Sequence, residues 1–321
     1  MTIAIILALV GFFIGIPFFC IYGGSIIPRY TWEHNDTGIT ITGVYGWRRD
    51  VVVPDTIRGY PVTQIGRPAP ETIIVGGRPE PAPGTRRERL EAVFAQARPV
   101  YATAPSRIGL FYRITGTQNI RTVTLPDTVT HIGVRAFDSL DNLESIYLPD
   151  GLVYIGDRAF RGCSGLREIN LPDSVVHIGE SAFESCLSLT EVILPVALTE
   201  VNRDVFRGCT NLGYIAIPDG ITEIGRGAFA MTGIKEIDIP INVTYIGGSA
   251  FARANNLESI TIPPGITTIY GNTFYNATNL RYVYYSDTLK RVGHNAFTGT
   301  PWLEEGGFEI MKQQLRDWGE Q

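Results

Sequence analysis

The sequence predicts a solenoid of short repeated coils that follows an N-terminal membrane helix, and three observations support this prediction. Residues 3–27 contain no charged side chain. Prolines recur every 23 residues, at Pro126, Pro149, Pro172, Pro195 and Pro218, then one residue early at Pro240 and again at Pro263. Phenylalanines keep the same period, at Phe137, Phe160, Phe183, Phe206, Phe229, Phe251, Phe274 and Phe297. Self-similarity with a period in the twenties is typical of solenoids, whose coils contact only their neighbours.

Each coil has the same order of apolar, turn and aromatic residues. The alternating apolar residues that end at Leu148 indicate a half-buried strand, which the next proline ends because it has no N–H to donate. A second short extended piece and a glycine turn follow, and Ala159-Phe160 then directs a large ring into the interior. A single coil cannot bury its own apolar side, so only stacked coils form a continuous core. One copy of the pattern comprises Leu143, Ile146, Leu148, Pro149, Leu152, Ile155, Gly156, Ala159 and Phe160.

This order of residues resembles the BspA-like class of leucine-rich repeat, with its motif L-P-x-x-hydrophobic-x-x-I-G-x-x-A-F followed by L-x-x-I-x. The resemblance covers residues 108–301 well and residues 54–66 in part. Members of the class are mostly surface or secreted interaction proteins, so the resemblance implies binding without naming a ligand. Five departures predict local irregularity in an intact solenoid. They are Asn202 and Tyr270 in place of glycine, Val205 and Thr273 in place of alanine, and Ser286 in place of proline.

The composition of the 321-residue chain argues against one class of partner. Its formal net charge is −5 at pH 7, whereas a general nucleic-acid binder needs a basic stripe. We therefore expect no nucleic-acid partner. The length suits one large domain or two ordinary ones, and a solenoid escapes the usual limit on core size because each repeat contacts only its neighbours.

Three of the four cysteines, Cys163, Cys186 and Cys209, occupy one position of three successive coils, and Cys20 lies in the apolar N-terminal segment. Coils stack at about 4.8 Å, which is within the Cα separations that a disulfide tolerates, so geometry alone leaves a disulfide open. Three cysteines in a row without a nearby histidine match no zinc spacing. A stacked row of small buried side chains is the simpler interpretation. We expect neither a metal nor another cofactor.

Residues 1–28 are predicted to form a transmembrane helix. A span needs roughly 20 apolar residues, and the charge-free run is long enough. A cleaved signal peptide is the competing interpretation, but such peptides begin with basic residues, and no Lys or Arg precedes Arg29. Gly11 and Gly15 form a small-xxx-small pair that could let another membrane helix approach. The segment therefore predicts a single-pass membrane protein that contacts the lipid bilayer through residues 3–27.

Two indications of membrane orientation oppose each other. Arg29, Arg48 and Arg49 follow the predicted span, and the positive-inside rule places such residues in the cytoplasm. The family resemblance implies an exported domain instead. We expect the repeat domain on the exported side, periplasmic or extracellular.

Between the membrane segment and the repeats, residues 29–53 are expected to form a linker and an N-terminal β-hairpin cap. Residues 39–53 contain alternating apolar residues, a glycine-containing turn and a β-branched run, which is the pattern of a hairpin. A solenoid needs such covers over its open apolar ends. The solenoid itself is expected to span residues 54–301, with Pro54 at the start of the first coil.

A proline- and arginine-rich insertion at residues 67–107 interrupts the first coil. It carries seven prolines and seven arginines. The capping-box spacing that begins at Thr85 predicts a short helix, and Leu90, Val93 and Phe94 fall on one face of it. Three interpretations stay open: an exposed solvated insertion, a docking arm whose apolar face lies on a partner, or a cover folded back onto the solenoid.

Residues 302–321 are expected to form a C-terminal cap helix. Phe308, Met311, Leu315 and Trp318 lie close to one helical face. Such a face suits a helix that lies over the last coil, with a membrane-surface helix as the rarer alternative.

No recognisable arrangement of catalytic residues occurs in the sequence. It has no P-loop, no GxSxG, no HExxH and no glycine-rich dinucleotide turn. His131 and His177 share a coil position, but Tyr154 lies in the coil between them, so about 10 Å separates their backbones. A metal needs ligands about 2 Å from its centre. We therefore expect a protein that is not an enzyme.

The strand residues that point outward are the candidate binding positions. They form two rows across the coils, none of them is Lys or Arg, and four are acidic. Such a surface repels nucleic acid and suits a neutral or basic protein. An ordinary solvated sheet face, rich in β-favouring Thr and Tyr, is the alternative. The candidate contacts are Tyr147, Glu168, Glu191, Tyr214, Glu236, Asp238, Tyr282 and Tyr284.

These observations predict a non-enzymatic, membrane-anchored protein-interaction scaffold built on leucine-rich repeats. Its expected partners are other proteins, integral membrane proteins included. Two more specific forms stay open. In one, the chain is a structural accessory subunit of a membrane protein complex, held by its transmembrane helix and insertion. In the other, it is a surface adhesin or receptor-like binder.

Overall fold

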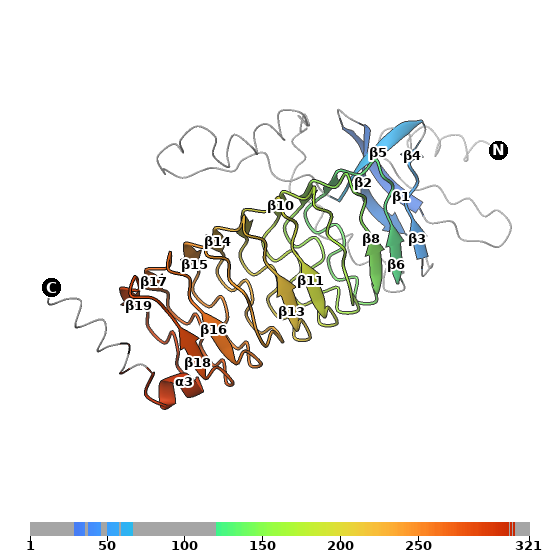
Figure 1. Ribbon diagram of the computed structural model, residues 1–321. Helices are drawn as coiled ribbons and strands as arrows, with labels where there is room; N and C mark the ends of the chain where they lie inside the picture. Colours follow the sequence, from blue (N-terminus) through green and yellow to red (C-terminus); the bar gives the residue numbers. More distant parts are fainter. Residues whose placement is uncertain are drawn as a thin grey trace, which may run out of the picture.

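The computed structural model describes residues 29–35, 38–45, 50–57, 59–66, 120–307, 309 and 311. Within them, the chain winds into a parallel β-solenoid whose coils stack along one axis (Figure 1). This confirms the predicted solenoid. The predicted transmembrane helix at residues 1–28 and the insertion at 67–107 lie outside the described residues. Among those that are described, no helix is long and apolar enough to cross a bilayer.

Most coils contribute a three-residue strand to a first strand row. The central residue of each strand is buried and its neighbours point outward, as the alternating pattern predicts. Consecutive strands pair in parallel, so that Val123 lies opposite Ile146. Two coils pass through the row without a regular strand, at residues 168–170 and 236–238. The row comprises β3 (Asp50–Val52), β6 (Thr122–Thr124), β8 (Ser145–Tyr147), β11 (Glu191–Ile193), β13 (Tyr214–Ala216), β16 (Ser259–Thr261) and β18 (Tyr282–Tyr284).

A second strand row follows the proline of each coil. Its strands are mostly two residues long. Most of them are followed by a glycine that donates its N–H to the preceding coil, as Gly156 does to the carbonyl of Ile132 at 2.8 Å. The row comprises β5 (Tyr60–Ile65), β7 (His131–Ile132), β9 (Tyr154–Ile155), β10 (His177–Ile178), β12 (Glu200–Val201), β14 (Glu223–Ile224), β15 (Tyr245–Ile246), β17 (Thr268–Ile269) and β19 (Arg291–Val292).

Each coil closes through a turn side, which runs from the glycine after the second row to the next first-row strand. Two residues on this side, four apart, have the left-handed conformation, as at Arg158 with φ 56° and Gly162 with φ 72°. Every second N–H group points to the next coil, and the N–H groups between them bond within their own coil. For example, Phe137 N donates to Ala159 O of the following coil at 2.7 Å. All three sides of a coil are therefore hydrogen bonded to neighbouring coils.

The phenylalanines predicted from the 23-residue period form one stack inside the solenoid. From Phe137 to Phe297, neighbouring ring centroids lie 5.1 to 6.0 Å apart, and the angle between ring planes does not exceed 24°. The six rings from Phe160 to Phe274 are fully buried. Inward residues of both strand rows pack around this stack in one continuous core.

The N-terminal end corrects one prediction. The hairpin joins β1 (Arg29–Asn35) to β2 (Gly38–Tyr45), and β2 pairs in parallel with β5. Residues 39–53 do not pair with each other as expected, because β3 pairs in parallel with β6 instead. Val51 is buried opposite Val123, so this β-branched run has the inward–outward pattern of a coil strand. The solenoid therefore begins at residue 50 and not at Pro54. A short β4 (Thr56–Ile57) pairs with β5.

At the C-terminal end, Trp302 covers the last ring of the stack. It belongs to α3 (Pro301–Glu304), whose first turn is capped by Thr300, since the Thr300 hydroxyl accepts from the Leu303 N–H at 3.2 Å. The Trp302 ring lies 4.4 Å from that of Phe297. Residues 312–321, which make up half of the predicted cap helix, lie outside the described part of the chain.

Candidate functional site

The outward side chains of the first strand row lie on one side of the solenoid, where Figure 1 shows β6, β8, β11, β13, β16 and β18 in succession. We call them, together with the outward residues of 168–170 and 236–238, the front face. Residues 168–170 and 236–238 keep the same alternation, because Ile169 and Ile237 are buried between exposed neighbours. All eight front-face residues predicted from the sequence are exposed, namely Tyr147, Glu168, Glu191, Tyr214, Glu236, Asp238, Tyr282 and Tyr284.

Several large exposed side chains near these residues were not singled out by the sequence analysis. Ile193 on the front face has an exposed fraction of 62%. Val196 and Ile241 lie at the corner directly after the coil proline, with exposed fractions of 66% and 70%. The sequence does mark Val196 and Ile241, because aspartate is the usual residue at the position after the coil proline. It occurs as Asp127, Asp150, Asp173, Asp219 and Asp287.

Charge is segregated around each coil. Between residues 122 and 270, all nine Lys and Arg lie on the turn side. The front face, the proline corner and the second strand row of these coils have no Lys or Arg, but they carry ten carboxylates. These are Asp127, Asp150, Glu168, Asp173, Glu191, Glu200, Asp219, Glu223, Glu236 and Asp238. Two sides of the solenoid are therefore acidic, although the chain as a whole is only moderately negative.

On the turn side, carboxylates are shared between arginines. Asp138 accepts from Arg161 at 2.9 Å and lies 3.9 Å from Arg135. Asp204 pairs with Arg203 at 3.0 Å and with Arg207 at 3.3 Å. Exposed pairs of this kind contribute about 0–1 kcal/mol each. The Arg161–Asp138 pair joins two coils, whereas the other three pairs lie within one coil. In these pairs, four arginines contact two aspartates.

The cysteine row is part of the core. Cys163, Cys186 and Cys209 are buried and free, and their thiols donate to the carbonyls of phenylalanines one coil earlier at 3.1 to 3.2 Å. Burial raises the pKa of the Cys163 thiol to about 12. Because the thiolate is the reactive and metal-binding form, this environment suppresses both kinds of chemistry. The interpretation as stacked small core residues is confirmed.

The two histidines of the second strand row stack on a tyrosine. The ring of Tyr154 lies 5.8 Å from that of His131 and 4.8 Å from that of His177. Burial lowers the pKa of His131, and Thr130 hydrogen bonds to its Nδ1 at 2.8 Å. Throughout the described ranges, no group of three or more His, Cys, Asp or Glu residues could hold a metal ion.

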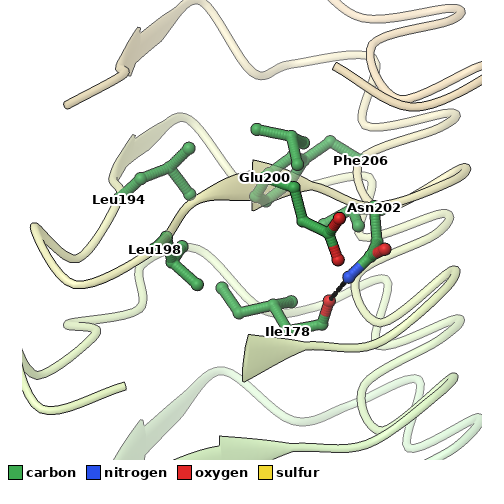
Figure 2. Close-up of a pocket in the computed structure, with 8 residues that line it drawn as sticks. Ile178, Leu194, Leu198, Glu200, Asn202 and Phe206 are labelled. Carbon is green, nitrogen blue, oxygen red and sulfur yellow. Dashed lines mark hydrogen bonds between the residues drawn. The ribbon is translucent and has the colours of Figure 1, made fainter. Parts of the chain in front are cut away.

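A small hollow lies beside Asn202, one of the residues that departs from the repeat motif (Figure 2). At the equivalent glycines, a side chain would strike the preceding coil, since a Cβ on Gly225 would lie 2.7 Å from Arg203 N. Asn202 therefore holds its coil away, and no ladder joins β10 to β12. Its Nδ2 donates to the carbonyl of Ile178 at 2.7 Å, in place of a backbone N–H. The hollow is too narrow for a water molecule, so it is a packing irregularity and not a ligand site.

The remaining predicted contact residues lie outside the described residues. These are Gly11 and Gly15 in the N-terminal segment, and Leu90, Val93 and Phe94 in the insertion.

Comparisons with known proteins place these features in context. The family model described as "BspA type Leucine rich repeat region" matches residues 111–212 and 176–304, with six copies of the repeat. No curated protein matches the chain.

Three solved structures of bacterial leucine-rich repeat proteins are similar to the chain. A leucine-rich cell surface protein from Faecalibacterium prausnitzii is 25% identical with a TM-score of 0.58, over 87% of this chain and 75% of that one. A leucine-rich repeat protein from T. pallidum is 23% identical with a TM-score of 0.41, over 89% and 92% of the two chains. One from Bacteroides ovatus is 21% identical with a TM-score of 0.40, over 86% and 80%.

Proposed function

The chain belongs to the BspA-type leucine-rich repeat family, and from this premise we propose that it is a non-enzymatic scaffold whose front face binds another protein. The observation that carries the proposal is the exposure of large aromatic side chains on this face. Tyr147 and Tyr214 have exposed fractions of 52% and 54%, and Tyr282 and Tyr284 of 58% each. No Lys or Arg lies among the front-face positions.

Tyrosines in this setting suit protein recognition for a physical reason. A tyrosine offers a large contact area and a hydroxyl, and loses little conformational entropy when it is fixed by a partner. The strands that carry these tyrosines rest on a continuously stacked core, so the face is rigid before binding. A pre-organised surface saves part of the ordering cost of association.

Membrane attachment through residues 3–27 is a further part of the proposal, supported by their charge-free sequence. An exported repeat domain is supported by the likeness to the Faecalibacterium prausnitzii cell surface protein. In this form, the chain is a surface adhesin or receptor-like binder. The alternative form, a structural accessory subunit of a membrane complex, is supported by Gly11 and Gly15 and by the apolar spacing of Leu90, Val93 and Phe94.

Site-specific photo-crosslinking in native cells tests the proposal. A photoreactive phenylalanine analogue replaces Tyr147, Tyr214 or Tyr282 on the front face. The matched aromatic controls are Tyr245 on the second strand row and Tyr270 directly after it. We expect protein adducts from the first set only. Adducts of the same proteins from both sets, or from the controls alone, contradict front-face binding.

A further inference from the structure

Four exposed apolar side chains cluster in the middle coils of the solenoid. Ile193 and Tyr214 lie on the paired strands β11 and β13, and Val196 and Ile241 lie at proline corners two coils apart. We call these four residues the Ile193 patch. Each has more than half of its surface exposed. Coils repeat at about 4.8 Å, so the patch extends over roughly 10 Å of backbone along the solenoid axis. Asp219 lies at the corner of the coil between Val196 and Ile241, so the apolar groups flank a carboxylate. Exposed apolar groups rimmed by polar residues mark interaction sites.

The two corner residues of the patch are not required by the fold. Most other coils place an exposed aspartate at this corner, as at Asp150 and Asp219. The corner therefore accepts a charged, solvated side chain without loss of the coil. Val196 and Ile241 replace it with apolar groups that the solenoid does not bury, at exposed fractions of 66% and 70%. Packing within the chain gives no reason for these two replacements.

Carboxylates surround the Ile193 patch. All are exposed, and none makes an ion pair within the part of the chain that the structure describes. Arg167 and Lys235 directly precede Glu168 and Glu236 in the sequence, at the ends of the turn side. A partner group placed on the patch is therefore close to several unpaired negative charges. The surrounding carboxylates are Glu168, Asp173, Glu191, Asp219, Glu236 and Asp238.

We propose that the Ile193 patch is the docking site for a cationic segment of the partner protein, with an apolar side chain held between lysines or arginines. This inference rests on the proposed function and names the chemistry of the partner. Apolar contacts with Ile193, Val196 and Ile241 anchor the segment, since buried central anchors carry most of the energy of an interface. The carboxylates select positive charge and speed association. The Tyr214 ring adds a face for a guanidinium or ammonium group.

The test measures binding of defined peptides to the full-length chain by fluorescence anisotropy. The first probe is a short peptide with Leu and Phe between lysines. In the second probe, glutamates replace the lysines, and in the third, serines replace the Leu and Phe. We expect Kd for the first probe to be lower than for the other two by about tenfold or more. Its affinity should fall as salt is raised, because the exposed charges become screened.

Variants of the protein separate this proposal from simple charge attraction. V196D combined with I241D restores the usual corner residue, so folding is expected to be kept, which an unchanged melting temperature checks. This pair of substitutions should raise the Kd for the first probe about tenfold. A second variant removes three carboxylates near the patch, by E191Q, E236Q and D238N. It should bind the first probe more weakly, and its binding should depend less on salt. The turn-side pair E180Q and E184Q should change neither the affinity nor its salt dependence.

Several results overturn the proposal. The first probe fails to bind at concentrations up to about 1 mM. The glutamate probe binds as tightly as the first probe. The V196D/I241D protein binds the first probe as tightly as the wild type does. Concentration-dependent self-association that this double variant abolishes also overturns it, because the occupant is then a second copy. If front-face crosslinks persist while the peptides do not bind, the proposed function stands and only the cationic partner fails.

Discussion

At the scale of single residues, Phe183 shows how stability is shared between coils. Its ring is fully buried and lies 5.2 Å from Phe160 and 5.6 Å from Phe206. Each ring in the stack therefore contacts the coil before it and the coil after it. Because a solenoid is stabilised by repeats and by nearest-neighbour interfaces, one ring contributes to three coils at once.

Replacing Phe183 by alanine should lower the free energy of unfolding by about 3–5 kcal/mol, the usual cost of a large-to-small core change. Adjacent coils should be weakened most, which hydrogen exchange of their backbone amides reports. Tyr147→Ala is the matched control, since that ring is exposed and its loss should change stability by about 0.5 kcal/mol or less. An unchanged melting temperature for Phe183→Ala would refute the place of this ring in the core.

His131 predicts a pH dependence of stability. Burial lowers its pKa in the folded chain, whereas the unfolded value is about 6.5. Above that pH the ring is neutral in both states, so the full stability is present. As the pH falls below it, the unfolded chain takes up the proton more readily and stability is lost.

Urea unfolding of the wild type and of H131Q between about pH 8 and pH 5 checks this sign. Below about pH 6.5, the free energy of unfolding of the variant should decline less than that of the wild type. Identical profiles for wild type and H131Q would show that His131 does not contribute.

At the scale of the repeat elements, the residue after each second-row strand decides whether the ladder continues. Glycine lets the backbones approach, as Gly179 and Gly225 do, and donates its N–H to the coil before it. Asn202 and Tyr270 stand at this position, and the second-row ladder is interrupted before both of them, between β10 and β12 and between β15 and β17. These two gaps in the second strand row are thus explained by the presence of a Cβ.

Gly225→Ala should therefore destabilise the solenoid by about 1–3 kcal/mol, because its Cβ would overlap the backbone of residues 202 and 203. Asn202→Ala should cost about 1 kcal/mol, since the coil is already displaced and only the bond to Ile178 is lost. Thermal and urea unfolding of both variants measure the difference. If Asn202→Ala proves the more damaging of the two, this account of the ladder is wrong.

Prediction from sequence succeeded where one pattern repeats and failed where it occurs once. The period of Phe160 and its equivalents specifies the coil, the stack and the exposed front-face tyrosines. At Asn202 the motif predicts an irregularity, but only coordinates show that its side chain replaces a backbone donor. For β3, the sequence pattern also fits a hairpin strand, and its real partner β6 is distant in sequence, beyond the insertion. Val196 was missed because only strand positions were considered.

At the scale of the whole molecule, residues 122–270 present two acidic sides and a turn side that is close to neutral, because its nine Lys and Arg lie among eight carboxylates. The charge of the surface is therefore distributed asymmetrically, which the net charge of −5 does not show. A charged partner is oriented by such a field before contact. The front face is therefore expected to meet a cationic partner in one preferred orientation, with the nearly neutral turn side turned away.

Membrane attachment is tested by the mass of the intact protein purified from its native membrane. Residues 3–27 are long and apolar enough to span the bilayer, so we expect them to be retained. The measured mass should then include residues 3–27. A mature N-terminus near residues 25–30 would show instead that the segment is a cleaved signal peptide.

The central claim, that the front face is the surface through which this scaffold binds proteins, is tested most directly by quantitative co-purification. The protein is isolated from native cells as wild type, as a Tyr147→Ser, Tyr214→Ser, Tyr282→Ser variant, and as a Tyr245→Ser, Tyr270→Ser, Tyr275→Ser control. We expect the front-face variant to lose its co-purifying proteins at an unchanged melting temperature, while the control keeps them. Retention of the same partners by the front-face variant, or equal loss from both, would contradict the claim.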